Sequence, residues 1–226
     1  MASNFFHIVG TDTEVGKSYI THQLLHILNK KNKAIPLKPI HSDWPNGEKL
    51  GEDLAIHKQF IQNQEISNLC CYHFDEPCSP NYAAHLEGAQ IKIDALDLFM
   101  EKAKSIPADT LLIEGIGGVC CPLGDQITYL DFIKRHKYPT IVVGRVGLGG
   151  LNHMIMTIKL LNSENIPIKA VVLNCEKEFE NNDPIYSSVI WELKQQIQCD
   201  IIGPIPRDND KLCRELLGKI DFTQSC

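Results

Sequence analysis

The chain has 226 residues, of which 43% are hydrophobic and 22% are charged, as is ordinary for a water-soluble globular protein. A net charge of -6 argues against a general nucleic-acid binder, which would carry a basic face. No apolar run approaches the length of a membrane-spanning helix. We therefore expect a single α/β domain over residues 1–226 that does not bind nucleic acid or a membrane.

Nine cysteines, an odd number, occur in the sequence, and the first residues carry no charged segment of the kind that begins a signal peptide. These features predict a cytoplasmic protein with free thiols. The adjacent pairs Cys70-Cys71 and Cys120-Cys121 do not have the spacing of zinc ligands.

The first third of the chain predicts a strand, a helix and a second strand. Residues 5–9 form a short apolar run that ends at Gly10, which is typical of a strand. Residues 16–31 have the period of an amphipathic helix. Residues 34–38 favour another strand, and the polar residues 41–51 favour a loop.

The rest of the chain continues the alternation of strands and helices. Apolar runs at residues 111–113, 141–143, 170–173 and 201–202 predict strands that are buried on both faces. Helical patterns cover residues 91–104, 151–161 and 184–198. This order predicts a parallel β-sheet with helices on both faces, and ligands at the carboxyl ends of its strands.

The strongest motif is the segment GTDTEVGKS at residues 10–18, between a predicted strand and a predicted helix. This context is typical of a P-loop, whose backbone N–H groups bind phosphates at the start of a helix. Lys17 would place a positive charge on the β- and γ-phosphates, and the hydroxyl of Ser18 would bind Mg²⁺. Five residues separate Gly10 from Gly16, where four are usual, and Thr11 holds the place of the first motif glycine. The alternative is an ordinary strand-to-helix turn.

Polar side chains after later strands are candidates for the same site. Glu114 directly follows the buried run 111–113, so we expect it at the same sheet edge as the P-loop. Asp53 begins a helical pattern, where an acid that stabilises the first turn is an alternative. Spacing alone does not choose Asp53 over Asp43 or Glu52. Lys38 follows the second strand and would stabilise negative charge, although a solvated loop lysine fits the sequence equally well.

Taken together and in order, these motifs resemble the dethiobiotin synthetase family. The similar segments are residues 10–18, Lys38-Pro39 with Ser42, residues 113–118, Ser79-Pro80, residues 147–153, Asn174 and residues 203–206. The resemblance runs from about residue 5 to residue 207. It implies an ATP- and Mg²⁺-dependent ligase that joins CO₂ to 7,8-diaminononanoate in biotin biosynthesis, through a carbamate and a carbamic–phosphoric anhydride. It also implies a homodimer with the site near the subunit interface.

The resemblance further implies a role for each matching residue. Lys17, Lys38 and Thr11 would act in catalysis, and Ser18, Asp53 and Glu114 would hold Mg²⁺. The nucleotide would be bound by Thr13, Glu14, Val15, Gly16, Lys17, Ser18, Tyr19, Asp53, Glu114, Gly115, Ile116, Gly117, Asn174, Cys175, Pro206 and Arg207. The diamine substrate would be bound by Ser42, Pro80, Gly149, Gly150, Leu151 and Asn152, with the last four coming from the other subunit.

Three positions depart from the family pattern. Ser18 stands where threonine is usual and keeps the hydroxyl group. Asp43 follows Ser42 where the family tends to have glycine, and Cys175 follows Asn174 where an acid is common.

Three other functions are compatible with a P-loop fold. A partitioning or membrane-associated ATPase would carry a second lysine early in the loop, where this chain has Asp12. Another ATP-dependent ligase on the same scaffold remains open, because a fold does not fix a substrate. The presence of Lys17, Ser18, Lys38, Asp53 and Glu114 argues against a non-catalytic nucleotide-binding protein.

Overall fold

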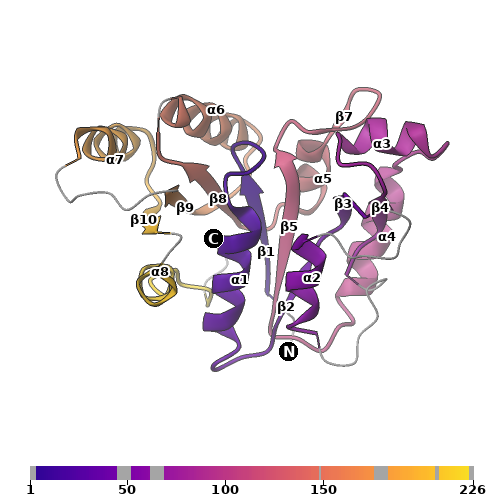
Figure 1. Cartoon of the computed structure of the whole chain (residues 1–226), viewed down its shortest axis with the longest axis horizontal. Helices are drawn as coiled ribbons and strands as arrows, with labels where there is room; N and C mark the ends of the chain where they lie inside the picture. Colours follow the sequence, from indigo (N-terminus) through magenta and orange to yellow (C-terminus); the bar gives the residue numbers. More distant parts are fainter. Residues whose placement is uncertain are drawn as a thin grey trace.

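A six-stranded parallel sheet forms the centre of the computed structural model, which describes residues 4–44, 52–61, 69–147, 149–175, 183–206 and 209–223 (Figure 1). The strands lie in the order β10-β9-β8-β1-β5-β2. Their bounds are β1 (Asn4–Gly10), β2 (Ala34–Leu37), β5 (Thr110–Gly118), β8 (Thr140–Arg145), β9 (Ile168–Cys175) and β10 (Asp200–Pro206). The predicted parallel α/β sheet is thereby confirmed.

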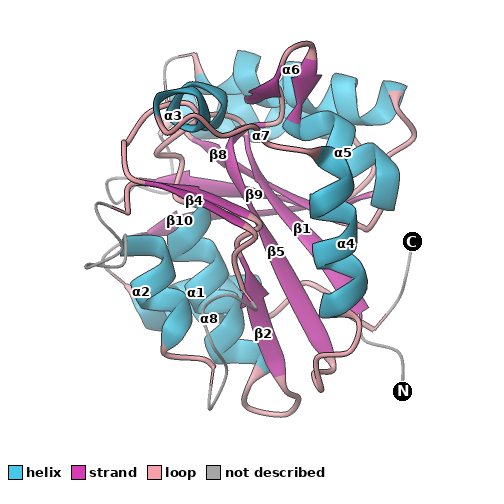
Figure 2. Ribbon diagram, turned by 90° about the vertical axis from the view of Figure 1, so that its right-hand side faces the viewer, coloured by secondary structure: helices cyan, strands magenta, loops and turns pink. Residues whose placement is uncertain are grey.

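Helices cover both faces of this sheet (Figure 2). One face packs against α1 (Lys17–Leu28) and α8 (Asp210–Leu217). The other packs against α4 (Ile93–Ala103), α5 (Tyr129–His136), α6 (Gly150–Ser163) and α7 (Pro184–Gln196). Of two short helices, α2 (Glu52–Lys58) lies beside α1, and α3 (Pro80–Leu86) lies near the carboxyl ends of the strands.

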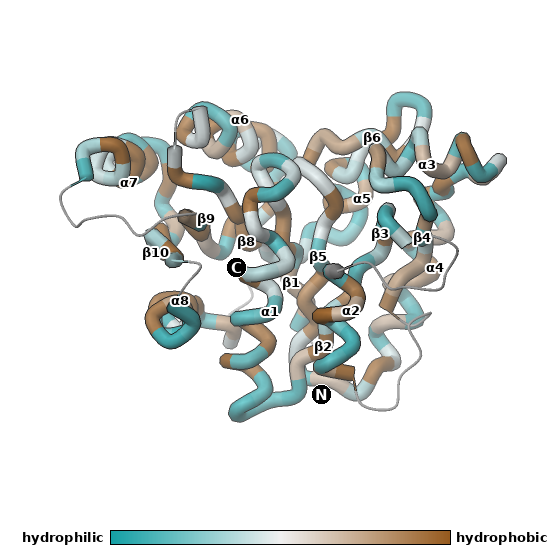
Figure 3. Tube along the Cα trace, viewed as in Figure 1, coloured by the Kyte–Doolittle hydropathy of each residue, from teal (hydrophilic) through white to brown (hydrophobic). Residues whose placement is uncertain are grey.

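The apolar strand runs supply both cores because successive side chains point to opposite faces of a sheet. In β5, Leu112 packs in the core beneath α1, whereas Leu111 and Ile113 pack on the opposite face. All three side chains are fully buried. In α1 and α8, hydrophobic and hydrophilic residues alternate along each helix, as expected of helices that cover a sheet (Figure 3).

Two small sheets were not predicted from the sequence. The segment β3 (Ile40–Ser42) pairs in parallel with β4 (Tyr72–Phe74), and β6 (Pro122–Gly124) pairs antiparallel with β7 (Ile127–Thr128). The expectation of a loop from residue 41 is therefore wrong for His41 and Ser42, and residues 45–51 lie outside the described part. Strands of two or three residues are too short to show a repeating apolar pattern.

The described cysteines all have free thiols, as the sequence predicts. In the described part of the chain, every helix is too short or too polar to cross a lipid bilayer.

Candidate active site

The P-loop connects β1 to α1 at the carboxyl edge of the sheet, as predicted. Gly16 precedes the first helical residue with a φ of 93°, a left-handed conformation that glycine adopts at little cost. This turn directs Lys17 back over the loop, where its Nζ atom donates to the backbone oxygen of Asp12 at 3.0 Å. Amides at the start of a helix and an ammonium group beside them are suited to bind an anion.

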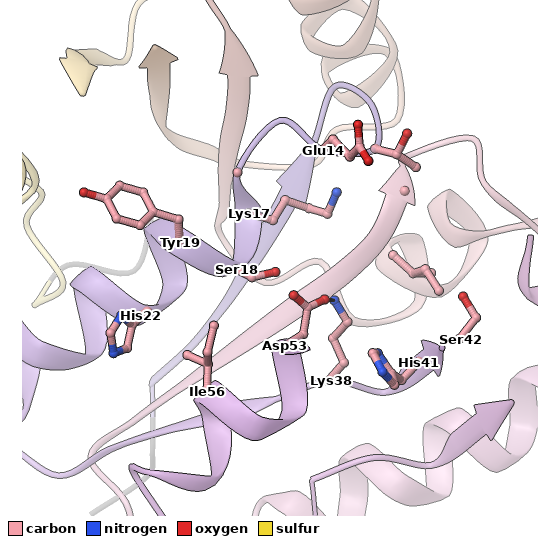
Figure 4. Close-up of a pocket in the computed structure, with 14 residues that line it drawn as sticks. Glu14, Lys17, Ser18, Tyr19, His22, Lys38, His41, Ser42, Asp53 and Ile56 are labelled. Atoms are coloured by element: carbon pink, nitrogen blue, oxygen red, sulfur yellow. Dashed lines mark hydrogen bonds and ion pairs between the residues drawn. The ribbon is translucent and has the colours of Figure 1, made fainter. Parts of the chain in front are cut away.

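A cleft of about 690 Å³ opens beside this loop (Figure 4). The P-loop and α1 form one wall, and α2, β3 and the end of β5 form the others. Its lining residues are Thr13, Glu14, Gly16, Lys17, Ser18, Tyr19, His22, Lys38, His41, Ser42, Asp53, Ile56, Ile116 and Gly117. Most of the residues predicted to bind phosphate therefore share one cavity with Lys38, Ser42 and Asp53.

Lys38 is the centre of a buried ion-pair network at the edge of this cleft. Its Nζ atom lies 2.6 Å from Oδ2 of Asp53 and 2.6 Å from Oε1 of Glu114. The hydroxyl of Ser18 donates to the same oxygen of Glu114 at 2.7 Å. These contacts join the P-loop, β2, α2 and β5 in a single polar cluster.

The opposite charges keep this network ionised despite its burial. Burial by itself would raise the pKa of Glu114, but Lys38 and His57 hold that pKa well below its ordinary value. Burial also opposes ionisation of Asp53, and Lys38 lowers its pKa. Burial acts to lower the pKa of Lys38, and Glu114 and Asp53 raise it above its ordinary value. Lys17 differs, because burial and then the charge of Lys38 lower its pKa to about 8.

The oxygen atoms around Ser18 suit a small, hard cation. Ser18 and Glu114 are in hydrogen-bond contact, and Asp53 shares Lys38 with Glu114. One hydroxyl and two carboxylates are the ligands that Mg²⁺ prefers when nucleotide phosphates complete its shell. Within the described ranges, no three His, Cys, Asp or Glu side chains gather as a metal site. A metal in this cleft would therefore depend on the Ser18 hydroxyl and on phosphate oxygens.

Several predicted site residues lie outside the cleft. Thr11 lines a separate cavity of about 560 Å³, which α6 and residues 118–121 also line. Thr13, two residues further along the P-loop, lines the main cleft. Gly115 lies beside the network, and its backbone oxygen accepts from Nζ of Lys38 at 3.5 Å.

Asn174, Cys175 and Pro206, which the resemblance assigns to nucleotide binding, do not line the cleft. Asn174 is buried and donates from Nδ2 to the backbone oxygen of Val15 at 2.8 Å, so it supports the loop. Cys175 is buried, and burial raises the pKa of its thiol to about 12. The backbone oxygen of Pro206 accepts from the hydroxyl of Tyr19 at 3.3 Å. Arg207 lies outside the described residues.

The predicted substrate residues separate into two groups. Ser42 lines the cleft, whereas Pro80 is buried at the start of α3 and does not. Gly149, Gly150, Leu151 and Asn152 form the start of α6, and none of the four lines the cleft of this chain.

Comparison with known proteins identifies the family. A model of the family described as AAA domain matches residues 5–212. The chain is 34% identical over 172 residues to ATP-dependent dethiobiotin synthetase BioD of Francisella tularensis subsp. tularensis, covering 75% of this chain and 76% of the relative. The chain belongs to the dethiobiotin synthetase family.

Other members also match most of the chain. The dethiobiotin synthetase of Anoxybacillus flavithermus is 28% identical over 223 residues, which cover 97% of this chain and 99% of the relative. The BioD 2 protein of Pasteurella multocida is 34% identical over 188 residues, covering 79% and 84%. The resemblance to dethiobiotin synthetase seen in the sequence is thereby confirmed, and so is the prediction of an ATP-dependent P-loop ligase.

Solved structures share the fold of this dethiobiotin synthetase family member. The McdA–ATP complex of Cyanothece has a TM-score of 0.58 at 14% identity, covering 98% of this chain and 91% of that one. The MinD cell division protein of Aquifex aeolicus has a TM-score of 0.54 at 14% identity, covering 96% and 88%. These TM-scores show a common fold. Because the sequence identity is so low, the likeness carries no information about the reaction.

Three cleft residues of this synthetase family member were missed by sequence reasoning. His22 and Ile56 line the cleft from α1 and α2. His41 lines it beside Ser42, and its buried Nε2 atom lacks a hydrogen-bond partner among the described residues. Burial and then the charge of Lys38 lower the pKa of His41. Each is an isolated residue outside the matched motifs, so no spacing pattern marks it.

Proposed function

We propose that this chain carboxylates 7,8-diaminononanoate with CO₂ and closes its ureido ring at the expense of ATP, giving dethiobiotin, ADP and phosphate. The names of its relatives support the overall reaction. One structural observation carries the assignment of residues. Lys38, directly after β2, forms ion pairs with Asp53 and Glu114 and lines the same cleft as Lys17 and Ser18.

The reaction has three steps. One amine of the substrate attacks CO₂ and loses a proton, which gives a carbamate. A carbamate oxygen attacks the γ-phosphorus of ATP, the bond to the β-phosphate oxygen breaks, and ADP leaves. The second amine then attacks the carbonyl carbon of the mixed anhydride, and phosphate leaves with the C–O bonding electrons while the amine loses a proton.

The two lysines would act through charge and position. Lys17 extends from the start of α1 and would lie against the β- and γ-phosphates, as in other P-loops. Lys38 would stabilise negative charge on the carbamate and on the transferring phosphoryl group. Phosphoryl transfer needs this type of electrostatic help more than covalent assistance. Thr11 and Ser42 remain candidates for contacts to the substrate.

Ser18, Asp53 and Glu114 would hold Mg²⁺. When bound, the ion neutralises charge on the phosphate oxygens of ATP. The hydrogen bond between Ser18 and Glu114 supports this assignment, because it brings a hydroxyl and a carboxylate together at the P-loop. Lys38 would balance the negative charge of the two acids.

A homodimer would complete the site. The four residues at the start of α6 lie away from the cleft of their own chain, and a helix N-terminus suits a carboxylate. We infer that Gly149, Gly150, Leu151 and Asn152 bind the substrate's carboxylate from the second subunit.

Product analysis tests the reaction. Purified protein should form ADP only when 7,8-diaminononanoate, bicarbonate and Mg²⁺ are all present. The Lys17→Ala variant should lose turnover while keeping the circular dichroism spectrum of the wild type. Equal ADP formation without the diamine would favour a switch ATPase, and unchanged turnover in Lys17→Ala would remove the P-loop assignment.

Mixing two inactive variants tests the shared site. Lys17→Ala damages the P-loop half, and Asn152→Asp adds a repulsive charge to the α6 half. Heterodimers of these two variants would contain one intact site, so mixing should restore activity. Mixing Lys17→Ala with Lys38→Met should restore none, because both changes damage the same half. Equal results for the two mixtures would exclude a site shared between subunits.

A further inference from the structure

His57 is a fully buried histidine that contacts the ion-pair network of Lys38 without lining the cleft. It lies four residues after Asp53 in α2, so both side chains lie on one face of that helix. Its Nε2 atom is 2.9 Å from Oε2 of Glu114, and both side chains have 0% exposure. His57 does not line the cleft.

The chemistry of the pair fixes the direction of this hydrogen bond. An ionised carboxylate only accepts hydrogen bonds, so Nε2 of His57 carries the hydrogen and donates it. The other ring nitrogen, Nδ1, is buried and has no partner among the described residues. Among the described residues, the imidazole therefore makes a single polar contact, which is to Glu114.

The two oxygens of Glu114 have different neighbours. Oε1 accepts from Ser18 at 2.7 Å and from Lys38 at 2.6 Å, on the side of the nucleotide cleft. Within the described part of the chain, Oε2 has only the histidine as a partner, at 2.9 Å. Without His57, Oε2 would be a buried carboxylate oxygen without a donor among the described residues, and the carboxylate group would lose the contact that fixes its orientation on that side.

We propose that His57 is a positioning residue that holds Oε2 of Glu114 and thereby directs Oε1 toward Ser18 and the metal of the bound nucleotide. The proposal rests on the proposed function, because it takes Glu114 as a ligand of Mg²⁺. Residues that hydrogen-bond to metal ligands orient them, and their loss typically costs about 10- to 100-fold in metal affinity or activity. Neither the motif search nor the resemblance pointed to this histidine.

Metal-dependent nucleotide binding tests the proposal without relying on turnover. Calorimetric titration with a non-hydrolysable ATP analogue at a series of Mg²⁺ concentrations gives the Mg²⁺ half-saturation point. His57→Leu removes the donor and should raise that point about tenfold or more. His57→Gln keeps an N–H group at a similar reach and should stay within about threefold of the wild type. His57→Asn has the same polarity but is too short, and should behave like His57→Leu.

A control variant distinguishes the loss of the Glu114 contact from the general effect of removing a buried side chain. His7→Leu removes an equally buried imidazole from β1, outside the cleft, and should leave the half-saturation point unchanged. If His57→Leu does not fold, the comparison of His57→Gln with His57→Asn decides. Wild-type half-saturation in His57→Asn, or a defect in His57→Gln as large as in His57→Asn, would overturn the role of His57. Binding by the wild type that is independent of Mg²⁺ would instead overturn the proposed function.

Discussion

Nζ of Lys38 lies 2.6 Å from Oε1 of Glu114, although the two residues are 76 positions apart in the sequence. They meet because β2 and β5 are neighbouring parallel strands in which Leu37 pairs with Ile113, so the residues that follow these two lie side by side. The side chains of Lys38 and Glu114 are 4% and 0% exposed, so this pair lies in a low-dielectric environment.

Replacing Lys38 by methionine should destabilise the protein strongly. The change leaves the buried Glu114 carboxylate without its cation and places it near the charge of Asp53. Removing one partner of a buried ion pair costs about 3–5 kcal/mol, because the other charge stays buried. Urea unfolding without nucleotide measures this loss, and the double variant Lys38→Met/Glu114→Gln should recover most of it.

Lys104→Met is the matched control for that experiment. Lys104 pairs with Glu101 at the same 2.6 Å, but the two side chains are 46% and 60% exposed. Solvent screening reduces such a pair to about 0–1 kcal/mol. Equal losses of unfolding free energy in Lys38→Met and Lys104→Met would contradict the prediction that breaking the buried ion pair costs more than breaking the exposed one.

Replacing Gly10 by alanine should disrupt the P-loop. A β-carbon at this position would lie 2.6 Å from the backbone oxygen of Asp12 and 2.8 Å from Nζ of Lys17. Since the backbone oxygen cannot rotate away, we expect the loop to shift and ATP affinity to fall by about tenfold or more, which corresponds to 1–3 kcal/mol of overpacking. Gly124→Ala is the control, because its nearest contact would be an ordinary 3.9 Å. Equal ATP affinity in the two variants would refute the prediction.

Replacing Asp43 by glycine should stabilise the protein. Asp43 follows Ser42 with a φ of 94°, a conformation that costs a residue with a β-carbon about 1–2 kcal/mol. Glycine avoids that cost but gains freedom in the unfolded state, so the expected net gain is up to about 1 kcal/mol. Asp43→Val should instead lose about 1–3 kcal/mol, because a β-branched residue tolerates positive φ poorly. Thermal unfolding measures whether each variant gains or loses stability. A loss of stability in both variants would argue against backbone strain at Asp43.

Acid should destabilise the protein partly through His7. This imidazole is fully buried in β1, and burial, aided by the charge of His136, lowers its pKa from 6.5 to about 3. A lowered histidine pKa means that the unfolded state binds the proton more strongly, so stability is complete above pH 6.5 and falls as the pH drops below it. Between pH 7.5 and 5.5 the loss should be about 1.4 kcal/mol. Urea unfolding at both pH values measures the fall in unfolding free energy, which should be smaller by that amount in His7→Leu than in the wild type. An equal fall in the two proteins would exclude His7 as the cause.

The sequence determined the fold class and most of the phosphate site. The apolar runs of β1, β5, β8 and β9 are buried on both faces, which leaves a continuous hydrophobic signal. The segment at residues 10–18 combines local turn chemistry with the start of a helix, so neighbouring residues alone specify it. The family resemblance extended this reading to residues as far apart as Lys38 and Glu114.

Other features were decided only by the tertiary structure. The side chain of Thr11 faces a different cavity from that of Thr13, because the loop turns between them. Asn174 supports Val15 instead of lining the cleft, since β9 ends behind the P-loop. His57 gained its partner through the packing of α2 against β5, which no local pattern records. Local sequence encodes strand, helix and turn through short-range sterics, whereas a contact between distant side chains depends on strand order, register and packing, which only the folded chain fixes.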